Sequence, residues 1–337
     1  MKKIICTWVY CPPVGKKYNH SQTGSDSDTA AVQALYWRCA ACLFASSSLV
    51  HDQTDTRHIL LCNVYPPEEI FGVNLPNFLQ NHHVEVIKFS EVTCTPADYY
   101  EAWNTQFIVL DALRELLAVS GSSDVLFVLD SDCVFSQPIS PEILQQVTQN
   151  KALLYTINYD RDYVVNGLTP EQMGEIECDI EGRNLRPEEP FLYQGGELIC
   201  LRGDQIGVVE RLGRRLLEVC LNRQNEGKQK YNEEAHLLSH VYRKLGYPSN
   251  SANEQQLIRR IWTDRGITRN IKGDESQLAI WHLPSEKRVG FRRFFSRASK
   301  MKVTHSSTMD QLFRIKESEY DRLVGNFRLL VKRIVRR

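Results

Sequence analysis

The sequence predicts an α/β fold with a mainly parallel sheet, because short apolar runs alternate with longer segments of helical periodicity. Residues 125–129, Val-Leu-Phe-Val-Leu, are apolar at every position. A run of this kind is typical of a central strand that is covered on both faces. Helix starts are indicated by residues suited to caps or first turns, such as Asp28 as an N-cap and Pro96 in a first turn.

The elements follow from these signals in chain order. We expect strands at residues 3–9, 58–64, 84–89, 125–129, 152–158, 191–201 and 278–282, and helices at about 28–48, 95–119, 205–221 and 232–245.

Length and composition restrict the class of protein. A chain of 337 residues with 42% apolar content can bury a large core, which excludes a disordered chain. Ten cysteines are too few for a disulfide scaffold, so we expect free thiols, including the Cys39 and Cys42 pair, which fits helical core packing. No apolar run reaches the ~18 residues of a membrane span, and the first residues lack a signal sequence. We therefore expect a cytoplasmic protein.

The charges are balanced overall but unevenly placed. The chain has 41 basic and 41 acidic residues, which disfavours a general nucleic-acid binder. Residues 286–337 hold 15 Lys/Arg against 5 Asp/Glu, a net charge of +10. We expect residues 1–285 to form one main domain and 286–337 to form a basic C-terminal helical tail.

Asp130 and Asp132 follow the apolar strand directly. At positions i and i+2 of an extended backbone, both carboxylates project from one face. The carboxyl edge of a buried strand is where open α/β sheets bind ligands, and two carboxylates there repel each other unless a cation separates them. The pair therefore predicts a divalent metal site, whereas two other Asp-x-Asp triplets, residues 26–28 and 160–162, are expected in surface turns.

Residues 125–134 resemble the Asp-x-Asp element of the GT-A nucleotide-sugar glycosyltransferases. Residues 280–287, Ile-Trp-His-Leu-Pro-Ser-Glu-Lys, are similar to the late histidine and lysine of the retaining galactosyltransferase and glycogenin-like group, although the Gly and Lys-Pro-Trp of that motif are missing. The resemblance implies a GT-A, Rossmann-like fold, with a nucleotide-binding half at about 1–135 and an acceptor half at about 136–285. It implies transfer of a sugar from a nucleotide donor, a UDP-sugar, to the hydroxyl of a saccharide, lipid-linked or protein acceptor.

The resemblance also implies a set of site residues. His282 would join Asp130 and Asp132 as a ligand of Mn²⁺ or Mg²⁺, which neutralises the leaving diphosphate. The expected nucleotide and donor contacts are Thr7, Trp8, Tyr10, Ser131, Gly195, Gly196 and Lys287, and the expected catalytic residues are Glu233, Glu234 and Gln194. Whether an acid at 233–234 acts as a general base or faces the anomeric carbon stays open.

Each of these residues has an ordinary alternative. His282 could be a core histidine, Gly195 and Gly196 could form a strand bend, and the two glutamates could simply favour a helix N-terminus. The main rival function is a haloacid-dehalogenase-type phosphohydrolase with Asp130 as nucleophile and Asp132 as acid/base. Its later acidic motif would be residues 273–275, but that family normally places the first motif at the start of the chain.

The last helix is amphipathic. Ser318 is a candidate cap, and apolar residues recur at spacings of three and four (Tyr320, Leu323, Val324, Phe327, Val331, Ile334, Val335), with Arg322, Arg328, Lys332, Arg333 and Arg336 opposite. Such a helix either packs on the catalytic domain or lies on an anionic membrane surface. The second case would place the enzyme peripherally at the inner face of the membrane.

Overall fold

The computed structural model describes residues 1–13, 15, 28–101, 103–183, 190–265, 268–300 and 306–335, with the backbone alone at 306–307 and 328–335. Its centre is a six-stranded sheet in the order β5-β2-β1-β6-β9-β8. Strands β5 (Val84–Lys88), β2 (Thr56–Cys62), β1 (Lys3–Val9) and β6 (Val125–Leu129) are parallel, and β9 (Leu198–Arg202) is antiparallel to both β6 and β8 (Ala152–Leu153). The predicted α/β class with a mainly parallel sheet is confirmed.

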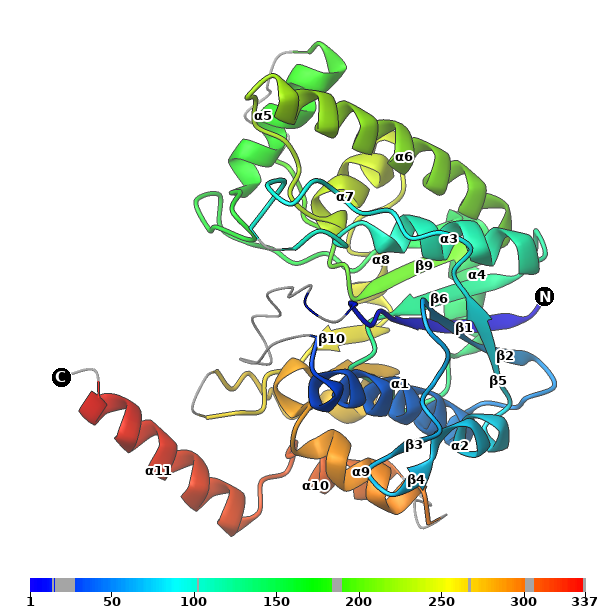
Figure 1. Cartoon of the computed structure of the whole chain (residues 1–337), viewed down its shortest axis with the longest axis vertical. Helices are drawn as coiled ribbons and strands as arrows, with labels where there is room; N and C mark the ends of the chain where they lie inside the picture. The colour runs from blue at the N-terminus through cyan, green and yellow to red at the C-terminus, as the bar shows by residue number, and fades with distance from the viewer. Residues whose placement is uncertain are drawn as a thin grey trace.

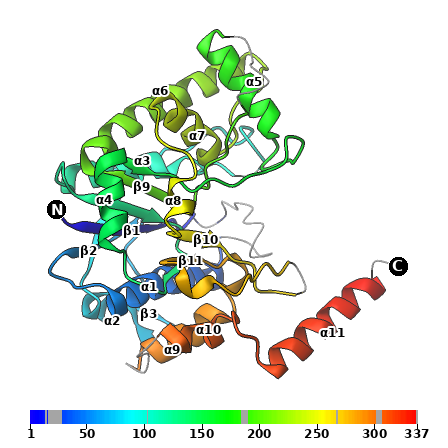
Figure 2. The same cartoon turned by 180° about the vertical axis from the view of Figure 1, so that it is seen from behind.

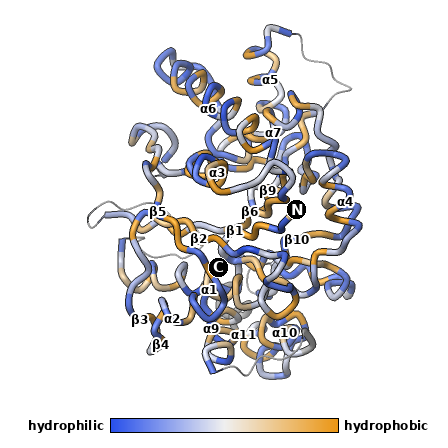
Figure 3. Tube along the Cα trace, turned by 90° about the vertical axis from the view of Figure 1, so that its right-hand side faces the viewer, coloured by the Kyte–Doolittle hydropathy of each residue, from blue (hydrophilic) through white to orange (hydrophobic). Residues whose placement is uncertain are grey.

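Helices cover both faces of this sheet (Figures 1 and 3). Because side chains alternate along a strand, Ile5 and Phe127 pack on one face while Ile4 and Leu126 pack on the other. The first face is covered by α1 (Ala30–Val50), α2 (Leu75–Asn81) and α4 (Pro141–Asn150), while α9 (Gly290–Ala298) packs on α1 and α10 (Ser306–Leu312) packs on α9. The second is covered by α3 (Ile108–Val119), α5 (Pro170–Glu181), α6 (Gly203–Asn225) and α7 (Glu234–Lys244).

A small second sheet joins two distant parts of the chain. Strand β7 (Cys133–Phe135) directly follows Asp132 and pairs antiparallel with β11 (Ile280–His282), which is parallel to β10 (Ile258–Arg260). In this register His282 lies opposite Cys133, and the Leu283 N–H donates to the Asp132 carbonyl at 3.0 Å. The sheet therefore brings a late histidine beside the early aspartates.

The remaining elements are short. They are the hairpin of β3 (Glu69–Ile70) and β4 (Val73–Asn74), helix α8 (Ser251–Glu254) and the 3₁₀ turns Glu275–Gln277 and Pro284–Glu286. All ten cysteines carry free thiols, and Cys39 and Cys42 are fully buried in α1.

The structure corrects several predicted boundaries. The helix expected at 95–119 begins only at Ile108, because tertiary contacts fix the preceding segment in an irregular path. Tyr99 donates its hydroxyl to the Tyr231 carbonyl at 2.6 Å, and the Lys230 ammonium donates to the Tyr99 carbonyl at 2.7 Å. The strands expected at 152–158 and 191–201 shorten to β8 and β9, and helix α1 is capped by Thr29 rather than Asp28.

Residues 286–337 do not behave as one tail. Helices α9 and α10 belong to the core, where Phe291, Phe294 and Phe313 are fully buried. Helix α11 (Glu319–Val335) instead projects from the body (Figures 1 and 2), and the Ser318 hydroxyl accepts the Asp321 N–H at its start, as predicted. Within the described residues, none of the helices combines the length and apolarity that crossing a membrane requires.

Candidate metal and donor site

A cavity of about 440 Å³ opens at the carboxyl ends of β1 and β6. The chain runs from β1 outward to β2 and β5 and then returns to β6 on the other side of β1, so the strand order reverses between β1 and β6. Open α/β sheets bind ligands at this kind of reversal. The volume suits a small-molecule ligand.

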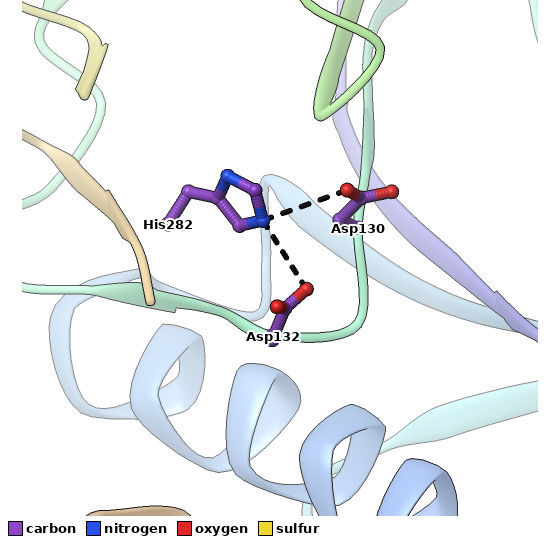
Figure 4. Close-up of side chains that lie close together, drawn as sticks. All are labelled: Asp130, Asp132 and His282. Atoms are coloured by element: carbon purple, nitrogen blue, oxygen red, sulfur yellow. Dashed lines mark ion pairs between the residues drawn. The ribbon is translucent and has the colours of Figure 1, made fainter. Parts of the chain in front are cut away.

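Three predicted metal ligands meet in this cavity (Figure 4). The Nε2 atom of His282 lies 3.3 Å from Oδ1 of Asp132 and 3.5 Å from Oδ2 of Asp130. One ligand atom from each residue lies within 4.8 Å of the other two. The side chains of Asp132 and His282 are each 4% exposed, whereas that of Asp130 is 37% exposed. Two carboxylates and one imidazole fit Mn²⁺, or Mg²⁺ with more water ligands.

The charged groups of the cluster shift one another's pKa values. Burial raises the pKa of Asp130 to about 6, although His282 opposes the rise and Asp132 adds to it. Burial would also raise the pKa of Asp132, but the Lys287 ammonium, which contacts its Oδ2, and His282 hold that pKa well below its usual range. Against the effect of burial, Asp132 raises the pKa of Lys287 to about 12. The site is therefore built to hold positive charge.

Glu233 and Glu234 lie at the start of α7 and differ in their partners. Glu233 accepts the Tyr193 hydroxyl at 2.9 Å and the side-chain amide of Asn166. Oε2 of Glu234 is buried and has no hydrogen-bond partner among the described residues. Burial raises the pKa of Glu233 to about 7, and burial together with Glu233 raises that of Glu234 well above its usual value. Glu234 therefore keeps an unused polar atom at the cavity.

Most of the predicted site residues line the cavity. They are Trp8, Tyr10, Asp130, Ser131, Asp132, Gly196, Glu233, Glu234, His282 and Lys287. Gly196 leaves room for a glutamate, since a Cβ there would lie 3.1 Å from Oε1 of Glu234.

Thr7, Gln194 and Gly195 do not line it. Thr7 is fully buried within β1. Gln194 accepts the Thr156 hydroxyl at 2.8 Å, and its N–H donates to Ser239 at 2.8 Å, so it holds the turn before β9. At Gly195 a Cβ would lie 2.8 Å from the ring of Tyr155, which indicates a packing role.

The structure adds cavity residues that the sequence analysis missed. Glu197 and Arg260 form an ion pair behind His282, and the lining also includes Tyr36, Tyr100, Trp103 and Trp262. Tyr100 and Trp103 lie in the segment that was predicted to be helical, and the helical pattern gave no reason to expect them at a ligand site. Glu197 directly follows Gly195 and Gly196, which were predicted donor contacts. That adjacency is the signal in the sequence that could have indicated Glu197 as a site residue.

The acidic motif of the phosphohydrolase alternative lies elsewhere. Asp274 forms an ion pair with Arg259, and Glu275 accepts the N–H groups of Lys272 and Gly273. Neither acid lines the cavity that contains Asp130.

No protein-family model and no curated protein matches the chain. Among solved structures, the chain is similar to the apo form of mouse xyloside xylosyltransferase 1, with 10% sequence identity and a TM-score of 0.45. The match covers 84% of this chain and 97% of that one.

Proposed function

We propose that the protein is a metal-dependent glycosyltransferase of the GT-A type that moves a sugar from a nucleotide donor, a UDP-sugar, to an acceptor hydroxyl. The observation that carries this proposal is the convergence of Asp130, Asp132 and His282 at the strand reversal beside β1. A divalent metal bound there would act as a Lewis acid on the departing diphosphate.

The chain's own groups have distinct parts in this proposal. Trp8 and Tyr10, at the end of β1, offer aromatic surfaces to the base. Lys287 supplies a positive charge for the diphosphate oxygens next to the metal ligands. We assign Glu234 to the reacting centre, because its oxygen has no partner, and Glu233 to holding the surrounding segments. Gln194, whose hydrogen bonds are internal, is left out of the catalytic set.

Product analysis distinguishes this function from its rival. With a UDP-sugar and Mn²⁺ but no acceptor, the protein should slowly release free sugar and UDP, because water replaces the acceptor. Asp130→Asn should abolish the release, whereas Asp160→Asn, in an exposed Asp-x-Asp triplet, should leave it unchanged. Inorganic phosphate released from simple phosphomonoesters, and lost in Asp130→Asn, would instead establish the phosphohydrolase.

We also propose that α11 attaches the enzyme peripherally to an anionic membrane surface, where a lipid-linked acceptor would be reached. Tyr320, Leu323 and Phe327 are 67–70% exposed and recur at spacings of three and four, so they share one helix face. Arg292 and Arg297 are exposed on α9, and residues 286–337 have a net charge of +10. Clustered basic residues contribute about 1 kcal/mol each near an anionic leaflet.

Vesicle co-sedimentation tests the attachment. The paired substitutions Leu323→Ser and Phe327→Ser should abolish binding to vesicles that contain phosphatidylserine, while Leu117→Ser, exposed on α3, should not. Substitutions are used instead of a shortened chain, because a chain that ends at Thr308 would lose the core residues Met309, Leu312 and Phe313. Binding that ignores lipid charge, or that survives the paired substitutions, would refute the proposal.

A further inference from the structure

His282 uses its two ring nitrogens differently. Nε2 faces the carboxylates of Asp130 and Asp132, while Nδ1 lies 3.2 Å from Oε1 of Glu197. The Glu197 side chain is fully buried, so its carboxylate contacts the imidazole in a site shielded from solvent. Burial of a charged group is costly unless the group is paired and hydrogen-bonded, so the partners of Glu197 must offset that cost.

Glu197 is paired by Arg260. The Nε and Nη2 atoms of Arg260 donate to the two carboxylate oxygens at 2.8 and 2.7 Å, a bidentate arrangement. The remaining nitrogen of Arg260, Nη1, donates to the Tyr159 hydroxyl at 3.2 Å. These contacts hold the carboxylate in a fixed position.

The backbone holds these three side chains in register. Arg260 and His282 lie opposite each other in the β10–β11 pair, and the Asp130 N–H donates to the Glu197 carbonyl at 3.2 Å. Gly195 makes room for the arrangement, because a Cβ at that position would overlap the Glu197 carboxylate. Strand ends from both sheets thus meet behind the imidazole.

An imidazole binds a metal through an unprotonated nitrogen, and the hydrogen bond made by its other nitrogen selects which one that is. A carboxylate beside Nδ1 accepts a hydrogen bond from Nδ1–H, so the proton stays on Nδ1 and the Nε2 lone pair faces the aspartates. We propose that Glu197, fixed by Arg260, is a positioning residue that sets the tautomer and orientation of His282 as a metal ligand. This inference rests on the proposed metal-dependent function.

The test is calorimetric titration of the full chain with Mn²⁺ in the absence of nucleotide. Glu197→Gln puts an amide where two carboxylate oxygens meet Arg260 and His282, and Mn²⁺ affinity should fall about 10- to 100-fold. The matched control is Glu181→Gln. Glu181 pairs with His240 at 2.9 Å and with Lys244 at 2.8 Å, but it does not line the cavity. This control should keep wild-type affinity.

A melting curve in chelator accompanies each variant, since a purely structural role would lower stability without changing Mn²⁺ affinity. If Glu197→Gln does not fold, Arg260→Lys keeps the positive charge but loses the bidentate contact, and it should still weaken Mn²⁺ binding at least threefold. Wild-type affinity in the folded Glu197 or Arg260 variant would overturn the inference alone. Absence of Mn²⁺ binding by the wild-type chain would overturn the proposed function as well.

Discussion

At the scale of single residues, the adjacent glutamates at the start of α7 show how neighbours acquire different roles. Glu233 has two hydrogen-bond donors directed at it, whereas Glu234 retains a buried oxygen without a partner among the described residues. Burial and the neighbouring Glu233 raise the pKa of Glu234, and a carboxyl group with a raised pKa can serve in proton exchange with a substrate. The residue with the unused oxygen is therefore the better candidate for chemistry.

We expect Glu234→Gln to lower kcat by about 10²- to 10⁴-fold with a similar melting temperature, because an amide keeps the shape but cannot transfer a proton. Glu233→Gln should chiefly lower stability, by about 1–3 kcal/mol, because its new amide faces the donors Tyr193 and Asn166. Steady-state kinetics and thermal melts of both variants check this pair. Full activity in Glu234→Gln, or the reverse ranking, would contradict the assignment.

At the scale of elements, a chain of buried hydrogen bonds ties α1 to β2. The Ile139 N–H donates to Nε2 of His51, whose Nδ1 lies 3.0 Å from the Ser47 hydroxyl, which in turn lies 2.9 Å from Nε2 of His58. Each neutral ring has one nitrogen to donate and one to accept, so both histidines are satisfied without charge.

Burial lowers the pKa of His51 to about 4, from an ordinary value of 6.5, and lowers that of His58 as well. The unfolded chain therefore binds more protons than the folded one between these values, and stability falls as the pH drops below about 6.5. Each such histidine contributes on the order of 1 kcal/mol per pH unit.

Urea unfolding between pH 7.5 and 4.5 should show this loss, and His51→Gln should reduce its slope. His83→Gln replaces an exposed histidine outside the hydrogen-bond chain and should keep the wild-type slope. A pH-independent midpoint, or an equal slope in His51→Gln, would argue against the hydrogen-bond chain as an acid-sensitive element.

Elements with a strong local pattern could be predicted from the sequence. Strand β6 matches its prediction residue for residue, because burial on both faces demands an apolar side chain at every position. The irregular path of the segment before α3 could not be predicted from the sequence. A proline and the apolar run that follows it favour a helix locally, whereas contacts with Tyr231 and Lys230 determine the path. Those contacts come from residues 131 and 132 positions after Tyr99, so no local sequence pattern indicates them.

At the scale of the whole molecule, the site depends on two sheets meeting. Asp130 and Asp132 could be found from the sequence because they end a recognisable strand, and His282 could be found only through a family resemblance. Glu197 and Arg260 were missed, because their meeting follows from the pairing of β10 with β11 and from the turn before β9. Pairing between strands that are far apart in the sequence builds the site, and local sequence patterns do not show which strands pair.

The central claim is that Asp130, Asp132 and His282 share a divalent metal with a nucleotide diphosphate, and a thermal melt tests it most directly. A ligand that binds only the folded state stabilises it by about 2.7 kcal/mol at a concentration of 100 Kd. UDP should therefore raise the melting temperature with Mn²⁺ and much less with chelator. Asp132→Asn should remove that difference, while Asp162→Asn, at an exposed position, should keep it. Equal stabilisation by UDP in Mn²⁺ and in chelator, with Asp132→Asn behaving as wild type, would contradict the account.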